Sequence, residues 1–188
     1  MHTYLILLRG INVGGKNILP MAGLKKCLEE LGFADVSTYI ASGNVLLASD
    51  KSPDEIKARI EVALTKNFKF DSELIKVLVL SHTQLQAVID NKPDGFGDQP
   101  DTYHSDAIFL MGIDAAQAMS VFSPRAGVDK VWPANEVIYS QRLSAERTRS
   151  RLSKIMASPL YKSMTIRSWN TTIKLLKLFE DIDNRKGA

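Results

Sequence analysis

The stretch YIASGNVLLAS, residues 39–49, decides which fold this chain can adopt. Ala41-Ser42-Gly43-Asn44 lies between two strand-like runs and is typical of a hairpin turn. Strands at 36–41 and 44–49 should therefore pair directly, with no helix between them. This pairing excludes a regular alternation of strand and helix, so the elements on either side of the hairpin define the fold.

The elements outside the hairpin complete a βαββαβ pattern with a trailing helix. Hydrophobic periodicity predicts strand 3–9, helix 20–32, the strands 36–41 and 44–49, helix 53–67, strand 73–80 and helix 82–91. Ser52-Pro53-Asp54-Glu55 is a capping box with proline at the first helical position, which supports the helix at 53–67. This order of elements is the split unit of ferredoxin-like folds.

The second half of the chain repeats the same order of elements. The pattern predicts strand 106–112, helix 115–122, strand 129–133, strand 136–141, helix 148–159, strand 163–168 and helix 171–182. Between the halves, residues 91–105 hold two prolines and two glycines, which predicts a linker. We therefore predict an α+β fold of two ferredoxin-like βαββαβ subdomains in tandem, residues 1–90 and 106–188, packed as one compact unit.

Composition and charge limit the class of protein. The 188 residues carry a net charge of +3 and one cysteine, Cys27, which excludes an internal disulfide and fits a reducing cytoplasm. Apolar runs such as Val77–Leu80 are far too short to span a bilayer, and the start of the chain lacks the pattern of a signal peptide. The three histidines and the cysteine give no metal-binding spacing. We expect a cytoplasmic protein without a membrane partner or a metal.

LRGINVGGKN, residues 8–17, follows the first strand and fits most of the phosphate-binding loop G-x-x-x-x-G-K-[ST]. Asn17 stands where a hydrolase needs a hydroxyl to hold magnesium, and Ile18-Leu19-Pro20 separates the lysine from the next helix. These departures argue against a nucleoside-triphosphate hydrolase. Gly14-Gly15 can still adopt left-handed backbone and turn successive N–H groups toward an anion. The alternative is a tight connection in which the glycines only form the bend.

A second strand-to-helix junction is TIRSWNTT, residues 165–172. We predict Asn170 as the N-cap of a helix that begins at Thr171. A helix start attracts anions, and strand alternation places Arg167 and Trp169 on one face. An arginine beside an aromatic ring can bind a phosphate or a carboxylate. The alternative is a half-buried tryptophan with the arginine stacked on it.

The motifs RGINVGGKN, YIASGNV and MTIRSWNTTIKL, in this order, resemble the bacterial family "domain of unknown function 1697" over essentially the whole chain. The resemblance implies an α+β fold of two related subdomains and implies no activity. The last motif of that family usually reads T-x-R-N-W-N-T, and Ser168 replaces its first asparagine here. The positions that match the family motifs are Arg9, Gly10, Asn12, Val13, Gly14, Gly15, Lys16, Asn17, Ser42, Gly43, Asn44, Arg167, Trp169, Asn170 and Thr171.

Polar residues form a large share of this set, which favours a shared ligand surface over a core. We hypothesise that loop 9–17, turn 42–44 and junction 167–171 converge on a small phosphorylated or anionic ligand. Basic side chains would neutralise it, backbone N–H groups would donate hydrogen bonds, and asparagines would orient it. The expected ligand-binding residues are Arg9, Asn12, Gly14, Gly15, Lys16, Asn17, Ser42, Asn44, Arg167, Trp169, Asn170 and Thr171. No catalytic residue, cofactor or reaction follows from the sequence.

Two other functions stay open. Residues 141–175 carry eight lysines and arginines, and Glu146 is the only acidic residue among them. The part of this basic zone between residues 142 and 167 could contact the phosphates of a nucleic acid. RNA-recognition modules of this fold display aromatics on the third strand. Strand 44–49 has none, and Tyr139 is a lone candidate in the second half. The remaining alternative is an interaction protein whose motifs only maintain the fold, and the sequence does not define an oligomeric state.

Overall fold

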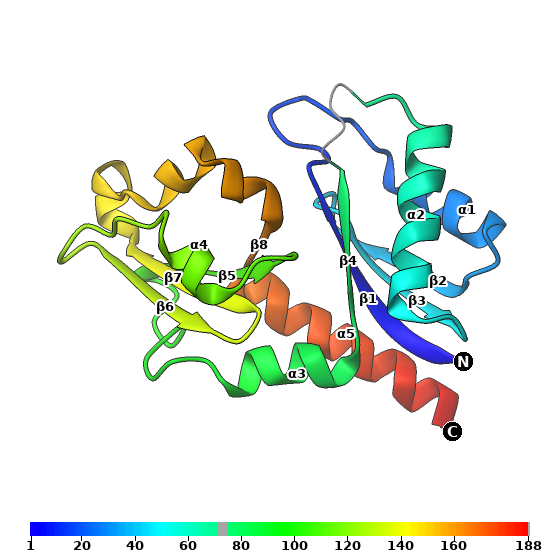
Figure 1. Cartoon of the computed structure of the whole chain (residues 1–188). Helices are drawn as coiled ribbons and strands as arrows, with labels where there is room; N and C mark the ends of the chain where they lie inside the picture. Colours follow the sequence, from blue (N-terminus) through cyan, green and yellow to red (C-terminus); the bar gives the residue numbers. More distant parts are fainter. Residues whose placement is uncertain (71–74, 188) are drawn as a thin grey trace. The chain divides into compact units, whose positions relative to one another are not determined.

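The computed structural model describes residues 1–70 and 75–187 of the chain (Figure 1). This part contains two four-stranded antiparallel sheets, with strand orders β2-β3-β1-β4 and β6-β7-β5-β8. Contacts divide the chain into unit 1, Met1–Gln86 with Leu175–Ala188, and unit 2, Ala87–Lys174. The two strand orders are equivalent, so the predicted α+β fold with two ferredoxin-like sheets is confirmed.

Unit 1 follows the predicted order of elements. Its elements are β1 (His2–Arg9), α1 (Met21–Glu30), β2 (Ala34–Tyr39), β3 (Asn44–Ser49), α2 (Pro53–Asn67), β4 (Lys76–Leu80) and the first part of α3 (His82–Asp90). The predicted strand at 73–80 is described from Lys76 onward, and its first two residues lie outside the described ranges. The predicted capping box begins α2, because the Ser52 hydroxyl accepts the Glu55 N–H and the Glu55 carboxylate accepts the Ser52 N–H.

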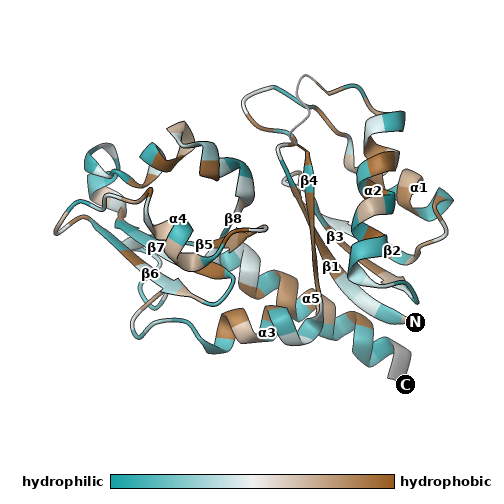
Figure 2. Cartoon of the chain, viewed as in Figure 1, coloured by the Kyte–Doolittle hydropathy of each residue, from teal (hydrophilic) through white to brown (hydrophobic). Residues whose placement is uncertain are grey.

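The core of unit 1 lies between the sheet and the helices α1 and α2. Alternate residues of β1, among them Ile6 and Leu8, are buried in one cluster with Leu24 of α1 and with Ile56 and Ile60 of α2. Figure 2 shows the hydrophobic residues concentrated along β1 and β4. The hairpin of β2 and β3 is present as predicted, with Tyr39 opposite Asn44 at its closed end.

Unit 2 repeats the sheet but not the second crossover helix. Its elements are the rest of α3, β5 (Tyr103–Leu110), α4 (Ala115–Met119), β6 (Asp129–Ala134), β7 (Val137–Leu143), the 3-10 helices η1 (Ser144–Arg149), η2 (Leu152–Ala157) and η3 (Pro159–Ser163), β8 (Met164–Ser168) and the start of α5 (Trp169–Gly187).

The prediction of an α-helix at 148–159 is wrong, and the backbone gives the reason. Ser150 and Ser158 adopt extended conformations that interrupt the helical path. Ser158 precedes Pro159, which disfavours helical geometry at the residue before it. The Asp129 carboxylate also accepts the Arg151 N–H at 2.8 Å, so this N–H cannot donate to a helical carbonyl.

The segment predicted as a linker, residues 91–105, is folded. Its last three residues are the first of β5, and Phe96 is fully buried against the rings of Trp132, Tyr139 and Trp169. The subdomain boundaries at residues 90 and 106 stay a prediction, and the contacts assign the chain from Leu175 onward to unit 1. Across the described ranges, no helix combines the length and apolar character needed to cross a membrane.

Candidate functional site

The glycine loop after β1 contains a miniature hairpin. Val13 pairs with Lys16, whose N–H donates to the Val13 carbonyl at 3.0 Å. Gly14 and Gly15 form the connecting turn, with φ of +57° and +74°, as a type I′ turn requires. Both glycines are exposed and both are left-handed, whereas an anion nest alternates right- and left-handed residues. They therefore form the exposed tip of this loop.

Two asparagines with left-handed backbone fix this loop. Asn12 donates through Nδ2 to the carbonyls of Leu19 and Ala41, at 3.0 and 2.8 Å, and its Oδ1 accepts the Leu19 N–H at 2.8 Å. Asn17 is buried and donates to the Gly10 carbonyl at 2.7 Å. Both amide groups hold the loop in shape, so a role for Asn12 in orienting a ligand stays a prediction without geometric support.

The turn between β2 and β3 lies directly against the glycine loop. The Leu8 N–H donates to the Gly43 carbonyl at 2.8 Å, and the Asn12 amide reaches Ala41. Asn44 is fully buried and donates to the Tyr39 carbonyl at 3.0 Å and to the hydroxyl of the exposed Ser42 at 2.9 Å. The structure therefore brings loop 9–17 and turn 42–44 together within unit 1.

The three predicted cations have different environments. Arg9 is half-buried at the end of β1 opposite Lys76, and Lys16 is exposed at the tip of its loop. Arg167 is 6% exposed in unit 2 and donates from Nη1 to Thr165 Oγ1 at 3.0 Å and to the Ile166 carbonyl at 2.8 Å. Burial lowers the pKa of Arg167 to about 10. Its guanidinium therefore stabilises the end of β8 through these hydrogen bonds, and it also places a positive charge there.

Junction 167–171 is the strand-to-helix turn that begins α5. The helix starts at Trp169, and Ser168 is its N-cap, because the Ser168 hydroxyl accepts the Thr171 N–H at 3.3 Å. The prediction of Asn170 as the cap is wrong, since Asn170 is an exposed residue within the first turn. The physical reason is sheet pairing: Ser168 is the last residue of β8 to pair with β5, opposite Asp106, so the chain leaves the sheet there.

A hollow of about 210 Å³ lies against the start of α5 in unit 2. Ser105 lines it, is only 9% exposed, and has a buried hydroxyl that meets no hydrogen-bond partner within the described ranges. A buried hydroxyl without a partner costs about 1–3 kcal/mol. The residues that line the hollow are Gly97, Pro100, Tyr103, His104, Ser105, Ser168, Trp169 and Asn170.

Strand register shows what surrounds Ser105 on the sheet. Ser105 lies opposite Gln141, which lies opposite Lys130, so all three side chains share one face of unit 2. The Lys130 ammonium lies 5.5 Å from the centroid of the Tyr103 ring. His104 Nε2 is 3.1 Å from the Asp106 carboxylate, and Asp106 is not among the residues that line the hollow.

The hollow therefore includes residues that the sequence analysis missed. Ser105 and Tyr103 fall in the segment predicted as a linker, and both line the hollow. The prolines and glycines of this segment favoured a linker, so the prediction placed the start of the strand later than Tyr103, where it begins.

The basic zone of unit 2 lies mostly on the 3-10 helices. Arg147, Arg149 and Lys154 are exposed, and Arg149 pairs with Glu146 at 3.0 Å. Tyr139, the lone aromatic considered for base stacking, is fully buried and donates to the Val88 carbonyl at 2.6 Å. Burial raises the pKa of Tyr139 to about 12. This side chain cannot stack on a nucleobase.

Asp129 anchors this zone to β6. Its buried carboxylate accepts the N–H groups of Arg125 and Arg151, at 2.9 and 2.8 Å. Burial disfavours its charge, but these hydrogen bonds and the nearby Arg125 charge outweigh it and lower the pKa of Asp129. Asp129 therefore fixes the path of the chain between β7 and η2.

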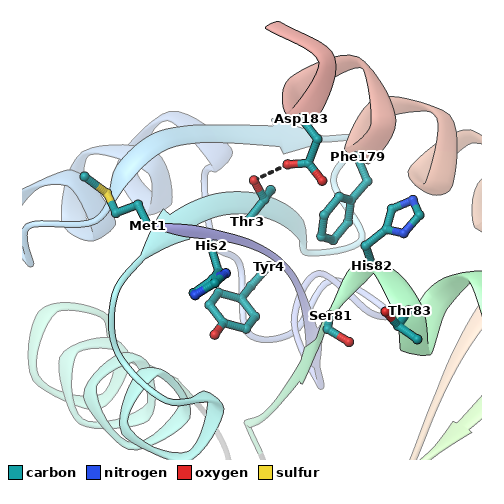
Figure 3. A pocket seen from close by; sticks show the side chains of 9 residues that line it. All are labelled: Met1, His2, Thr3, Tyr4, Ser81, His82, Thr83, Phe179 and Asp183. Carbon is teal, nitrogen blue, oxygen red and sulfur yellow. Dashed lines mark hydrogen bonds between the residues drawn. The ribbon is translucent and has the colours of Figure 1, made fainter. Parts of the chain in front are cut away.

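Unit 1 has a wider, open depression of about 570 Å³ (Figure 3). Thr3 Oγ1 donates to the Asp183 carboxylate at 2.5 Å, and the ring centroids of His82 and Phe179 lie 5.3 Å apart. These contacts join β1, α3 and α5 to one another. In the part of the chain that the structure describes, no group of three or more His, Cys, Asp or Glu residues could hold a metal ion.

Comparison with known proteins places the chain among uncharacterised relatives. A family model described as "protein of unknown function (DUF1697)" matches residues 1–139. The solved structure of the conserved bacterial protein SP0830 from Streptococcus pneumoniae is similar, with 27% sequence identity and a TM-score of 0.79. The match covers 94% of this chain and 98% of that one. No curated protein matches the chain.

Proposed function

This chain belongs to the family of proteins of unknown function DUF1697, and from that premise we propose that it binds a small anionic ligand at the start of α5. The observation that carries the proposal is the buried Ser105 hydroxyl without a partner, which lines a hollow beside the first turn of a long helix. In this proposal the anion accepts hydrogen bonds from the first amides of α5 and from the Ser105 hydroxyl.

The helix start adds donors to this hydroxyl. The first N–H groups of a helix have no intrahelical acceptor, and the N-terminus carries a partial positive charge. In α5 the Ser168 hydroxyl accepts the N–H of Thr171. Trp169 and Asn170 precede Thr171 in the first turn and line the hollow. Their amides and the Ser105 hydroxyl form the proposed donor set, and Arg167 adds positive charge from the adjoining strand.

Loop 9–17 and turn 42–44 form a second candidate surface, which belongs to unit 1. Their asparagines are committed to the backbone, so the contacts they offer a ligand are the exposed tip and the cation of Lys16. Arg9 and Lys16 remain candidate anion contacts at a separate surface of unit 1, and we assign Asn12, Asn17 and Asn44 to the shape of the loops.

The Ser105→Ala variant tests the proposal because its effect on thermal stability should differ between the anion-free and the anion-bound protein. Without ligand, the variant should be as stable as wild type or more stable, since it removes a buried hydroxyl that lacks a partner. With inorganic phosphate or sulfate, wild type should gain melting temperature and the variant should gain less. Thermal unfolding of both proteins across an anion titration measures this difference.

Ser140→Ala is the matched control. Ser140 is a buried serine of the same sheet that does not line the hollow. Its response to the anions should equal that of wild type. Equal anion responses in wild type and Ser105→Ala would overturn the proposal.

A further inference from the structure

We infer that the 3-10 segment of unit 2, residues 144–163, binds the phosphate backbone of double-stranded nucleic acid without reading its sequence. None of these residues lines the hollow at α5, so the inference does not rest on the anion site proposed there. Three features carry it: an excess of cations that the fold does not require, a fixed backbone, and side chains suited to phosphates and not to bases.

The two units of the chain allow an internal comparison of this segment. In unit 1 the third strand of the sheet is joined to the fourth by α2, and in unit 2 the corresponding connection is made by η1, η2 and η3. Helix α2 carries three cations and three carboxylates, whereas residues 144–163 carry five cations and one carboxylate. The same connection is built in unit 1 without net charge, so the sheet does not require the positive charge found in unit 2.

Most of these cations face solvent without an acidic partner. The five are Arg147, Arg149, Arg151, Lys154 and Lys162. Four of them are exposed and Arg151 is half-buried. Within the described ranges only Arg149 forms an ion pair, with Glu146 at 3.0 Å. Clustered like charges repel one another, and a bound polyanion would remove this repulsion.

The backbone beneath the cations is fixed to unit 2 (yellow to orange in Figure 1). Leu152 and Ile155 of η2 are buried, and Ile155 belongs to the core cluster that includes Ile108 of β5. The Asp129 carboxylate accepts the Arg151 N–H at 2.8 Å. A surface that is ordered before binding loses less conformational entropy when the partner arrives.

The side-chain types indicate contacts to phosphates and not to bases. Residues 144–163 contain six serines and threonines beside the five cations, and all of these residue types contact phosphates in protein–DNA complexes. The segment has no tryptophan, phenylalanine or histidine, and Tyr161 is half-buried. Proteins that bind single strands without sequence preference stack the bases on aromatic rings. The surface therefore fits the regular backbone of a duplex better than a single strand.

Fluorescence anisotropy of three labelled probes with the full chain tests the inference: a short DNA duplex, an RNA duplex of the same sequence, and the single-stranded DNA. Each phosphate that a cation neutralises contributes about −0.9 to the slope of log affinity against log salt on B-DNA. Four or five such contacts give a slope of about −4, which is a loss of roughly 200-fold between about 50 and 200 mM salt. We expect at least one duplex to bind more tightly than the single strand, and the tighter duplex identifies the kind of nucleic acid.

Lys154→Met should reduce the magnitude of the salt slope by about one and weaken duplex binding about fivefold, while its thermal stability equals that of wild type or rises. Lys57→Met is the matched control, because Lys57 is an exposed lysine of α2, the corresponding connection of unit 1. The duplex affinity and the salt slope of this control should equal those of wild type.

Equal effects of Lys154→Met and Lys57→Met on duplex affinity would overturn the inference, and so would the absence of duplex binding at about 50 mM salt. A single strand or phosphatidylserine vesicles that bound as tightly as the duplexes would also overturn it. Ser105→Ala should bind the duplexes as wild type does, so a failure of this surface is distinguishable from a failure of the anion site at α5.

Discussion

Gly97 illustrates how a single residue holds the wall of the hollow. Its φ of +76° is left-handed, and a Cβ at this position would collide with Cδ1 of Trp169 and lie 2.5 Å from Nε1. Gly95 has the same φ of +76°, but a Cβ there would meet no atom within 4 Å among the described residues. The two glycines share the same backbone cost and differ in the space around them.

Gly97→Ala should therefore destabilise the protein more than Gly95→Ala does. The left-handed backbone costs each alanine about 1–2 kcal/mol, and crowding against Trp169 should add about 1–3 kcal/mol at residue 97. Urea unfolding followed by tryptophan fluorescence measures both variants. Equal losses of unfolding free energy would show that the loop shifts to accommodate the methyl group.

At the scale of elements, the N-cap of α5 explains why serine can replace asparagine at residue 168. The residue that resemblance leads one to expect at 168 is asparagine, and serine stands there. Serine and asparagine are both strong N-cap residues, because each accepts a hydrogen bond from the first turn. The structure thus gives residue 168 a capping role that either side chain can fill.

Ser168→Asn should leave stability nearly unchanged, and Ser168→Ala should cost about 1 kcal/mol, the usual loss when a cap is removed. Chemical denaturation of the two variants beside wild type measures the difference. An asparagine variant as unstable as the alanine variant would contradict a capping role and point to the hydroxyl itself.

Elements with strong local signals could be predicted from the sequence. The hairpin at Ser42-Gly43 and the capping box at Ser52 depend on neighbouring residues, so their positions were right. The segment 148–159 has helical spacing, but Asp129, distant in sequence, takes one of its backbone donors. Long-range contacts of this kind leave no mark within the segment.

The candidate site was predicted only in part, for a related reason. The start of α5 could be found because a strand, a cap and a helix follow one another along the chain. Ser105 reaches the start of α5 only through the pairing of β5 with β8, which places Asp106 opposite Ser168, and this pairing joins segments far apart in the sequence. The buried hydroxyl that carries the proposed function was therefore invisible before the structure.

At the scale of the whole molecule, α5 belongs to both compact units. Trp169 packs against Phe96 in unit 2, and Phe179 packs against His82 in unit 1. Both tryptophans of the chain, Trp132 and Trp169, lie in unit 2. Tryptophan fluorescence therefore reports the unfolding of unit 2, whereas circular dichroism reports both units.

Phe179→Ala should destabilise unit 1 by about 3–5 kcal/mol, because it removes a fully buried ring from the core of that unit. We expect the circular dichroism transition to broaden toward lower denaturant while the fluorescence midpoint stays close to that of wild type. Phe96→Ala, which acts in unit 2, should shift the fluorescence midpoint. If Phe179→Ala moved both signals equally, the two units would unfold as one.

The sharing of α5 also has a consequence for synthesis on the ribosome. Domains generally fold in order as they emerge, from the N-terminus onward. Here Met1–Gln86 of unit 1 leaves the ribosome before unit 2, but Phe179 and Asp183, which pack against α3 and β1, are translated only after unit 2. Unit 2 has all its residues by Lys174. Unit 1, which begins first, is thus completed after unit 2, and the nascent chain carries β1 without its final partner helix until unit 2 has been translated.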